Sequence, residues 1–308
     1  MRRHHATGLF VLLAAVWGTG FVATKVGLET IPPVLFAAVR FDVAALVLFG
    51  YLLVRDIEWR PRRGDWYPLV VGGTLLIGAH HAFLFAGQQY VTSAVAAVLL
   101  GLIPVVTPVL MRLTATGERL SPVGVTGVLV GFGGVLVIAN PDPTALLSDV
   151  RGVALVFASA LTFAVGAVVT YDRNPGLSLP AEQAWMMLVG SAVLHAASVV
   201  VGESVPAVWT VEAVAAVGYL AVAAGVFGFM LYFFLLDALG PIEMSLIEYV
   251  IPLFAALTGW LALGESLAPT TVAGFVLIVV GFTLVKGRAL RTALRRRGTA
   301  GTPSRLER

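Results

Sequence analysis

Ten apolar stretches, each close to the length needed to cross a lipid bilayer, constrain this chain more than any other feature. A membrane-spanning helix needs about 20 consecutive apolar residues, and Pro, Gly or charged residues bound each stretch. The stretches lie at about 7–27, 32–54, 67–87, 92–113, 121–139, 152–171, 183–201, 211–236, 241–263 and 269–286. Only 12% of the residues are charged, against about a quarter in soluble proteins. The sequence therefore predicts an all-α polytopic membrane protein with ten transmembrane helices.

These helices use most of the 308 residues, so the connections are too short for a further catalytic domain. No GxxxxGKS/T phosphate-binding motif occurs, which excludes a built-in ATPase. The chain has no cysteine, so it has no disulfide, thiolate metal site or thiol nucleophile. We expect no cofactor, metal site or nucleic-acid partner. Arg2 and Arg3 before the first apolar stretch also fit a secretory signal peptide, but that stretch has a counterpart inside the chain, which favours a transmembrane helix.

The second half of the chain repeats the first. A shift of 147 residues gives six identities within 22 positions and lays Glu118, Leu120, Pro122, Val125, Gly127 and Gly134 on Glu265, Leu267, Pro269, Val272, Gly274 and Gly281. Shifts of 148 and 146 place Pro104 on Pro252 and Trp17 on Phe163. We interpret residues 1–145 and 146–287 as two five-helix repeats. Because five is odd, the second repeat enters the membrane from the opposite side, as in the inverted repeats of many secondary transporters.

The basic residues predict the orientation. If both termini are cytoplasmic, all but three of the 20 Lys and Arg residues lie on the inner side, the exceptions being Lys25, Arg40 and Arg151. Such a positive-inside bias is typical of multi-pass membrane proteins. We expect residues 288–308 to form a basic cytoplasmic tail against anionic lipids, with a specific partner site as the alternative.

Several segments together resemble the EamA-type family of the drug/metabolite transporter superfamily. They are AAVWGTGFVATK, AAVRF, FAGQQYVTSAVAAVLLGLIPV and the related turns TGERLSP and LGESLAP, within a match from Leu9 to Lys286. The resemblance implies a ten-helix permease in the cell membrane. Its expected substrates are small organic metabolites such as amino acids, or drug-like compounds, exported more often than imported and often exchanged for protons. Two residues depart from the pattern: Phe163, where the family often has Trp, and Asp42, where an apolar residue is expected.

Ionisable residues deep in the spans are candidates for function, because a charge at the bilayer centre costs about 2.5–3.5 kcal/mol on insertion scales. Glu248, in the ninth span, is a candidate for binding a proton and a cationic substrate in turn, or is a neutral or paired acid that links helices. Arg40, in the second span, binds a substrate carboxylate, extends outward to the membrane surface, or forms an internal ion pair. Asp42 lies about 200° around the helix from Arg40 and is not its partner. We expect the turn acids Glu118 and Glu265 to stabilise helix N-termini rather than bind substrate.

His80 and His81 lie in the third span. Adjacent helical side chains diverge by about 100°, so the two rings do not share one metal ion. One of them, for which we take His81, is expected to face the cavity and to titrate near neutral pH, while the other packs. Gln88, at the end of this span, is expected in a solvated loop or an outer vestibule.

The aromatic residues Trp17, Tyr232, Tyr249 and Trp260 lie at depths where a cavity wall is possible. Packing and interfacial anchoring are the alternatives. Trp17 is the strongest of them because it belongs to the family-like Trp-Gly step. With Arg40, His81 and Glu248, the residues Trp17, Tyr232 and Tyr249 form the predicted substrate site.

The sequence thus predicts a secondary transporter that works by alternating access, exporting its substrate in exchange for protons through Glu248. An uncoupled facilitator or an importer of the same fold remains an alternative. An intramembrane enzyme would need a convergent Ser-His or Asp-Asp pair, which the spans do not offer convincingly. A scaffold or receptor is disfavoured by the repeat.

Overall fold

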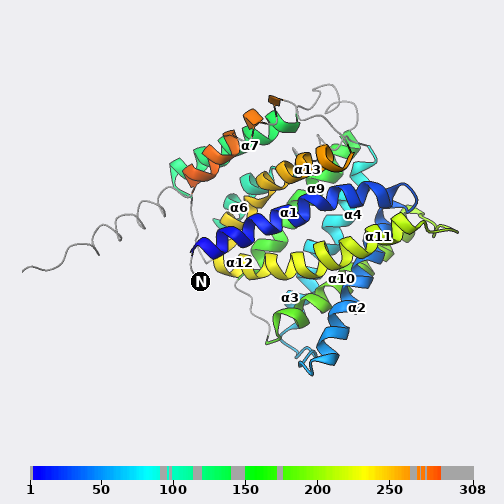
Figure 1. The fold of residues 1–308 in the computed structure, drawn as a ribbon. Helices are drawn as coiled ribbons and strands as arrows, with labels where there is room; N and C mark the ends of the chain where they lie inside the picture. Colours follow the sequence, from blue (N-terminus) through cyan, green and yellow to red (C-terminus); the bar gives the residue numbers. More distant parts are fainter. Residues whose placement is uncertain are drawn as a thin grey trace, which may run out of the picture.

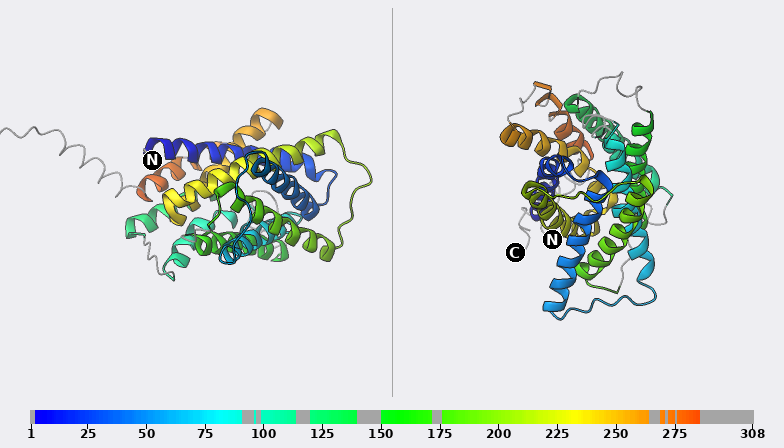
Figure 2. Two further views of the ribbon diagram at one scale, coloured as in Figure 1. Left: turned by 90° about the horizontal axis from the view of Figure 1, so that it is seen from below. Right: turned by 90° about the vertical axis from the view of Figure 1, so that its right-hand side faces the viewer.

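The computed structural model describes residues 3–90, 96, 99–113, 120–139, 150–171, 176–263, 269–270, 272–274 and 276–285. The helices are α1 (Arg3–Leu28), α2 (Pro33–Val54), α3 (Trp66–Gly72), η1 (Gly73–Ala79), α4 (His80–Gln88), α6 (Ile103–Met111), α7 (Pro122–Ala139), α9 (Val150–Thr170), α10 (Leu179–Val201), α11 (Val211–Tyr219), η2 (Leu220–Phe227), α12 (Gly228–Ser245) and α13 (Ile247–Leu263). Val272–Val285 forms a further apolar helix. Figure 1 and the two further views in Figure 2 show them packed into one helical bundle.

The predicted spans correspond to these helices. Within the described residues, six helices are long and apolar enough to cross a bilayer, and three shorter apolar ones accompany them. The third and eighth predicted spans are each continuous helices built from three labelled pieces, α3–η1–α4 and α11–η2–α12. The related turns with Glu118 and Glu265, and the basic tail, lie outside the described residues.

The break expected between the eighth and ninth spans is present. Gly240 has a φ of 80° within α12, a conformation that glycine adopts without the steric penalty of a Cβ. Pro241 follows and cannot donate a backbone hydrogen bond to the preceding turn. At the other end of this span, the Thr210 side chain accepts a hydrogen bond from Ala213 N at 3.2 Å and caps the start of α11.

The two repeats run in opposite directions, as their second helices show. Near the start of α2, Glu203 just beyond the end of α10 binds the amide of Val34. Farther along α2, the ring of Phe49 packs edge-on against Trp185, near the start of α10, with centroids 5.3 Å apart. Later residues of α2 therefore contact earlier residues of α10, so the two helices are antiparallel.

The fifth and tenth helices repeat this relation at the opposite edge of the bundle (Figure 1). A Cβ built on Gly127 would lie 2.6 Å from the carbonyl oxygen of Gly281, and one built on Gly134 would lie 2.6 Å from that of Gly274. Since a shift of 147 exchanges Gly127 with Gly274 and Gly134 with Gly281, each contact is the symmetry mate of the other. This reciprocal contact is the signature of a two-fold relation, and it confirms the predicted inverted repeat.

A π-helical segment occurs at the same place in each repeat. η1 covers Gly73–Ala79 and η2 covers Leu220–Phe227, and adding 147 to the first range gives 220–226. Such wide turns are rare and concentrate at functional sites. Gly73 also permits close contact with α10, because a Cβ there would lie 2.6 Å from the carbonyl oxygen of Met186.

The outward faces of the bundle are apolar. Leu46, Leu53 and Val200 are 70%, 65% and 86% exposed, as expected for side chains that contact lipid rather than water. One polar pair interrupts this surface: Nε2 of His195 on α10 lies 2.6 Å from Oδ2 of Asp42 on α2. The Asp42 that departs from the family pattern therefore faces away from Arg40 and pairs with the other repeat.

Candidate functional site

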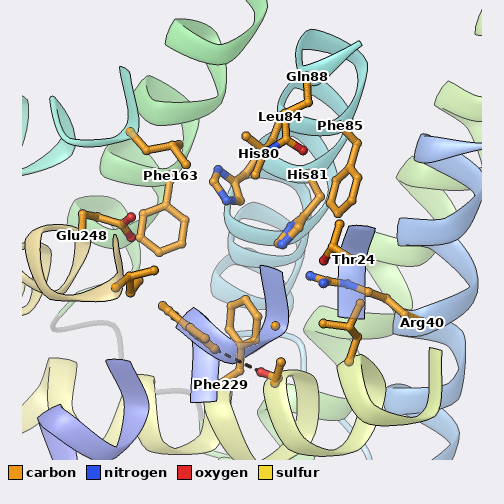
Figure 3. Close-up of a pocket in the computed structure, with 16 residues that line it drawn as sticks. Thr24, Arg40, His80, His81, Leu84, Phe85, Gln88, Phe163, Phe229 and Glu248 are labelled. Atoms are coloured by element: carbon orange, nitrogen blue, oxygen red, sulfur yellow. Dashed lines mark hydrogen bonds between the residues drawn. The ribbon is translucent and has the colours of Figure 1, made fainter. Parts of the chain in front are cut away.

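A pocket of about 130 Å³ lies in the middle of the bundle, between the two repeats (Figure 3). The first repeat contributes α1, α2, α4 and Leu100 to its wall, and the second contributes α9, η2, α12 and α13. The lining residues are Trp17, Gly20, Thr24, Arg40, His80, His81, Leu84, Phe85, Gln88, Leu100, Phe163, Leu220, Ala224, Phe229, Glu248 and Ile251. Both π-helical segments border this region, because η2 supplies Leu220 and Ala224 while η1 leads directly into the two histidines.

Four of the six residues predicted to bind substrate meet in this pocket: Trp17, Arg40, His81 and Glu248. They come from α1, α2, α4 and α13, which are remote from one another in sequence. Together with the other lining residues, they surround a space that a small molecule can occupy with ionisable, aromatic and apolar groups.

Aromatic rings form one side of the pocket. Trp17 stacks on Tyr232, with ring centroids 5.4 Å apart, and lies at the same distance from Phe229. Its Nε1 donates a hydrogen bond to the carbonyl oxygen of Ala224 in η2 at 3.1 Å. Tyr232 is only 2% exposed and lies behind this layer, where it also contacts Phe163 at 5.6 Å. Tyr232 thus supports the pocket wall instead of lining it.

Tyr249 and Trp260 lie away from the pocket. The hydroxyl of Tyr249 donates to the carbonyl oxygen of Val128 in α7 at 2.9 Å, and its ring fills the space beside Gly131, where a Cβ would lie 2.6 Å from it. Trp260 is 46% exposed on the outside of the bundle. Tyr249 thus joins α13 to α7, and its predicted contact with substrate is not part of this pocket.

Arg40 projects into the pocket as a buried cation. Its side chain is 7% exposed, its Nε has no hydrogen-bond partner, and no ion pair joins its guanidinium to a carboxylate among the described residues. The Cζ atom lies 4.4 Å from the centroid of Phe41 and 5.8 Å from that of Phe85. The internal ion pair considered from the sequence is therefore not seen in the described part of the chain, and two aromatic faces compensate the charge in part.

Glu248 lies on the other side of the pocket, as Figure 3 shows. It comes near the start of α13, just after the turn at Leu246. No hydrogen bond or ion pair joins its carboxyl group to another described residue. An acid without such a partner, bordering a cavity, can exchange a proton or a ligand without breaking an internal contact.

Both histidines line the pocket, whereas the sequence predicted that only one would. His81 donates through Nδ1 to the carbonyl oxygen of Ile77 at 2.8 Å. His80 donates through Nδ1 to the carbonyl oxygen of Ser159 at 3.2 Å, with Oγ of the same serine 2.8 Å away. His80 thus fastens α4 to α9 while still bordering the cavity.

Other lining residues escaped sequence reasoning. Phe229 and Ala224 come from the eighth span, which reads as uniformly apolar and offers no sign of its inward face. Gln88, for which the sequence left a solvated loop or an outer vestibule open, is half-buried at the end of α4 and borders the pocket. Thr24 on α1 also lines the pocket, near Arg40 (Figure 3). For Gln88 and Thr24, the signal available in the sequence was a polar residue near the end of an apolar span.

Comparisons with known proteins agree with this architecture. The chain matches the EamA-like transporter family twice, over residues 6–140 and 150–286. It is 28% identical to the uncharacterized inner membrane transporter YedA of Escherichia coli K12 over 90% of this chain and 89% of that protein. It is 29% identical to the protein PecM of Dickeya dadantii over 89% and 90% of the two chains.

A solved crystal structure shares the fold, with a TM-score of 0.76 and 22% identity over 91% of this chain and 97% of the other. The family matches cover both repeats, so they account for the fold and exclude the enzyme alternative. The chain is a multi-pass membrane transporter that belongs to the EamA-like transporter family.

Proposed function

We propose that this protein is a secondary transporter that carries small organic molecules through the central pocket by alternating access, exporting them in exchange for protons. Glu248 is the proton-binding group. Arg40, His81 and the aromatic wall around Trp17 hold the substrate. We place the protein in the inner membrane, by analogy with YedA, with both termini in the cytoplasm.

The observation that carries the proposal is the position of Glu248. Its carboxyl group borders the pocket between two inverted repeats and makes no hydrogen bond or ion pair with another described residue. Inverted repeats supply two related conformations that open the same site to opposite sides. An acid at that site can carry a proton in one direction and an amine-bearing substrate in the other, because one group cannot bind both at once.

The pocket geometry suggests which side is open. The lining residues on α1 run from Trp17 to Thr24, and those on α4 run from His80 to Gln88, so the pocket extends toward the ends of α1 and α4. These ends lie on the outer side if the positive-inside rule holds. The stacked rings of Trp17 and Tyr232 then lie on the cytoplasmic side of the site.

The test uses purified protein in proteoliposomes loaded with a pH-sensitive dye. A panel of radiolabelled amino acids and amine-bearing drug-like compounds is offered with and without an imposed pH gradient. We expect the gradient to drive accumulation of at least one compound, with a matching proton movement. Glu248→Gln should abolish gradient-driven accumulation and leave passive exchange of that compound measurable.

Glu212→Gln is the matched control, because Glu212 is exposed in the first turn of α11 and lies away from the pocket. It should keep wild-type accumulation. If the compounds cross the membrane without proton movement, the protein is an uncoupled facilitator and not a proton-coupled exporter. Unchanged pH dependence in Glu248→Gln would remove Glu248 from the coupling step.

A further inference from the structure

The central pocket is lined by a basic and an acidic residue that do not pair with each other. Arg40 and Glu248 both line it, yet no ion pair joins them. Figure 3 shows them on opposite sides, with the rings of Phe163 and His81 between them. Oppositely charged groups attract strongly in a medium of low dielectric constant, so their separation reflects the positions of α2 and α13 and not a lack of attraction.

Each charge is left without a protein counterion within the described residues. Arg40 is 7% exposed, and its Nε has no hydrogen-bond partner. The rings of Phe41 and Phe85 compensate it in part, since cation–π contacts are worth only about 0.5–2 kcal/mol. Burial of an unpaired charge is costlier than that. The site is therefore incomplete until an anionic group reaches Arg40 and a cationic group reaches Glu248.

The wall between the two charges is aromatic. Trp17, Phe163 and Phe229 line the pocket, and the nearby rings of Trp17 and Phe229 have centroids 5.4 Å apart. Such a wall provides dispersion contacts and excludes water, but it supplies few hydrogen bonds. It suits an apolar or aromatic body between the two charged ends.

The repeat shows that these charges are a feature of the site and not of the scaffold. A shift of 147 places Arg40 on Met187, and the shift of 148 that aligns Pro104 with Pro252 places Leu100 on Glu248. Neither charge has a charged counterpart in the other repeat. The reciprocal glycine contacts between α7 and the last helix obey the two-fold relation, whereas the pocket charges do not.

We propose that the pocket selects amphoteric molecules whose carboxylate and ammonium groups lie at opposite ends of an apolar body, the carboxylate at Arg40 and the ammonium at Glu248. This inference rests on the proposed transport function and names its substrate class. α-Amino acids carry both charges on neighbouring atoms, so they satisfy one side of the pocket and leave the other unpaired. They are poor ligands for that reason.

Pairs of isomers test the separation between the carboxylate and ammonium groups, because the two isomers have the same atoms and net charge and differ in that separation. Leucine is compared with ε-aminocaproate, and phenylglycine with para-(aminomethyl)benzoate. Binding is measured on the purified full-length protein by calorimetry, and transport is measured separately in proteoliposomes. We expect the charge-separated isomer of each pair to bind about tenfold more tightly or better, as pairing one more buried charge implies.

Two variants test which end of the ligand binds at Arg40 and which binds at Glu248. Arg40→Gln should lose the preference for ε-aminocaproate over hexylamine, because the carboxylate no longer meets a cation. Glu248→Gln should lose the preference for ε-aminocaproate over caproate, because the ammonium no longer meets an anion. Arg40→Lys keeps the charge and should retain most of the preference, which guards against a variant that simply fails to fold.

The outcomes separate this inference from the proposed function. Equal or tighter binding of leucine and phenylglycine overturns the inference, even if a pH gradient drives their transport. Failure of all four compounds to bind overturns it as well. Preferential binding of the separated isomers without any transport would support the inference and contradict the transport proposal.

Discussion

Trp17 of the first helix stacks on Tyr232 of the eighth, with ring centroids 5.4 Å apart and planes 29° from parallel. The indole also donates to the carbonyl oxygen of Ala224 at 3.1 Å. One side chain thus joins the first repeat to the second directly beside the pocket. A movement that parts α1 from η2 and α12 would separate the two rings and break this hydrogen bond.

Replacing Trp17 by Phe should keep most of the ring contact and remove the hydrogen bond to Ala224. We expect a loss of about 1 kcal/mol in the free energy of unfolding, while Trp17→Ala should cost about 3–5 kcal/mol because it also opens a cavity. Thermal unfolding in detergent measures both. Trp260→Phe, on the exposed outside of the bundle, is the matched control, and an equal loss there would contradict the role of Trp17.

Gly127→Ala should destabilise the contact between α7 and the last helix. The added methyl group would lie 2.6 Å from the carbonyl oxygen of Gly281, and the helices must separate at a cost of about 1–3 kcal/mol. Gly133→Ala in the same helix meets nothing within 4 Å, so it should be neutral or stabilising by up to about 1 kcal/mol, following helix propensity. Both changes in the free energy of unfolding are measured by titrating the detergent-solubilised protein with a denaturing surfactant. A larger loss for Gly133→Ala would argue against this packing.

Glu203 should anchor the start of α2 to the end of α10. Its two carboxylate oxygens accept hydrogen bonds from Val34 N at 2.9 Å and Leu35 N at 2.7 Å, and Ser198 Oγ donates to the carboxylate at 2.8 Å. Glu203→Ala removes a charged cap from a helix N-terminus and should cost about 1–2 kcal/mol. Glu203→Gln should cost less, since it keeps an acceptor. Hydrogen exchange of the first turn of α2 should rise in both variants, and unchanged exchange would refute the anchor.

The pH dependence of stability should carry a contribution from Asp65, in the loop before α3. Its carboxylate accepts hydrogen bonds from Arg62 N at 2.7 Å and Gly176 N at 2.9 Å. These backbone donors lower the pKa of Asp65 below its ordinary value. Because the folded-state pKa is depressed, the stabilisation is present above about pH 4 and is lost as the pH falls through the lowered value.

Asp65→Asn should therefore lower the melting temperature at neutral pH. The difference in melting temperature between this variant and the wild type should become smaller below about pH 4. Asp56→Asn, an exposed substitution in the same loop, should show no such convergence. A constant difference between Asp65→Asn and the wild type at every pH would mean that the carboxylate charge contributes nothing.

Sequence reasoning succeeded where the signal is local or periodic. Span length and hydropathy fixed the helices, the Gly240–Pro241 step marked a real break, and the self-alignment led to the inverted repeat. Arg40 and Glu248 stood out because charges are rare in such helices. Each of these features is visible within one span or in the comparison of two.

Contacts between distant segments could not be read in the same way. Glu203 binds the amides of Val34 and Leu35 from nearly 170 residues away, and its sequence surroundings resemble any polar loop. His195 pairs with Asp42 across two helices of different repeats, and nothing in the sequence around either residue points to the other. Tyr249 was expected at the pocket because of its depth, but depth does not reveal which way a side chain points around the helix axis.

The paired wide turns also bear on the history of the chain. A π-helical turn arises where one more residue is accommodated than an α-helical path allows, and η1 and η2 occupy matching positions. Two separate insertions at one matching point would be a coincidence. The simpler account is that a single five-helix ancestor already carried the insertion, and that gene duplication copied it into both descendants before their pocket residues diverged.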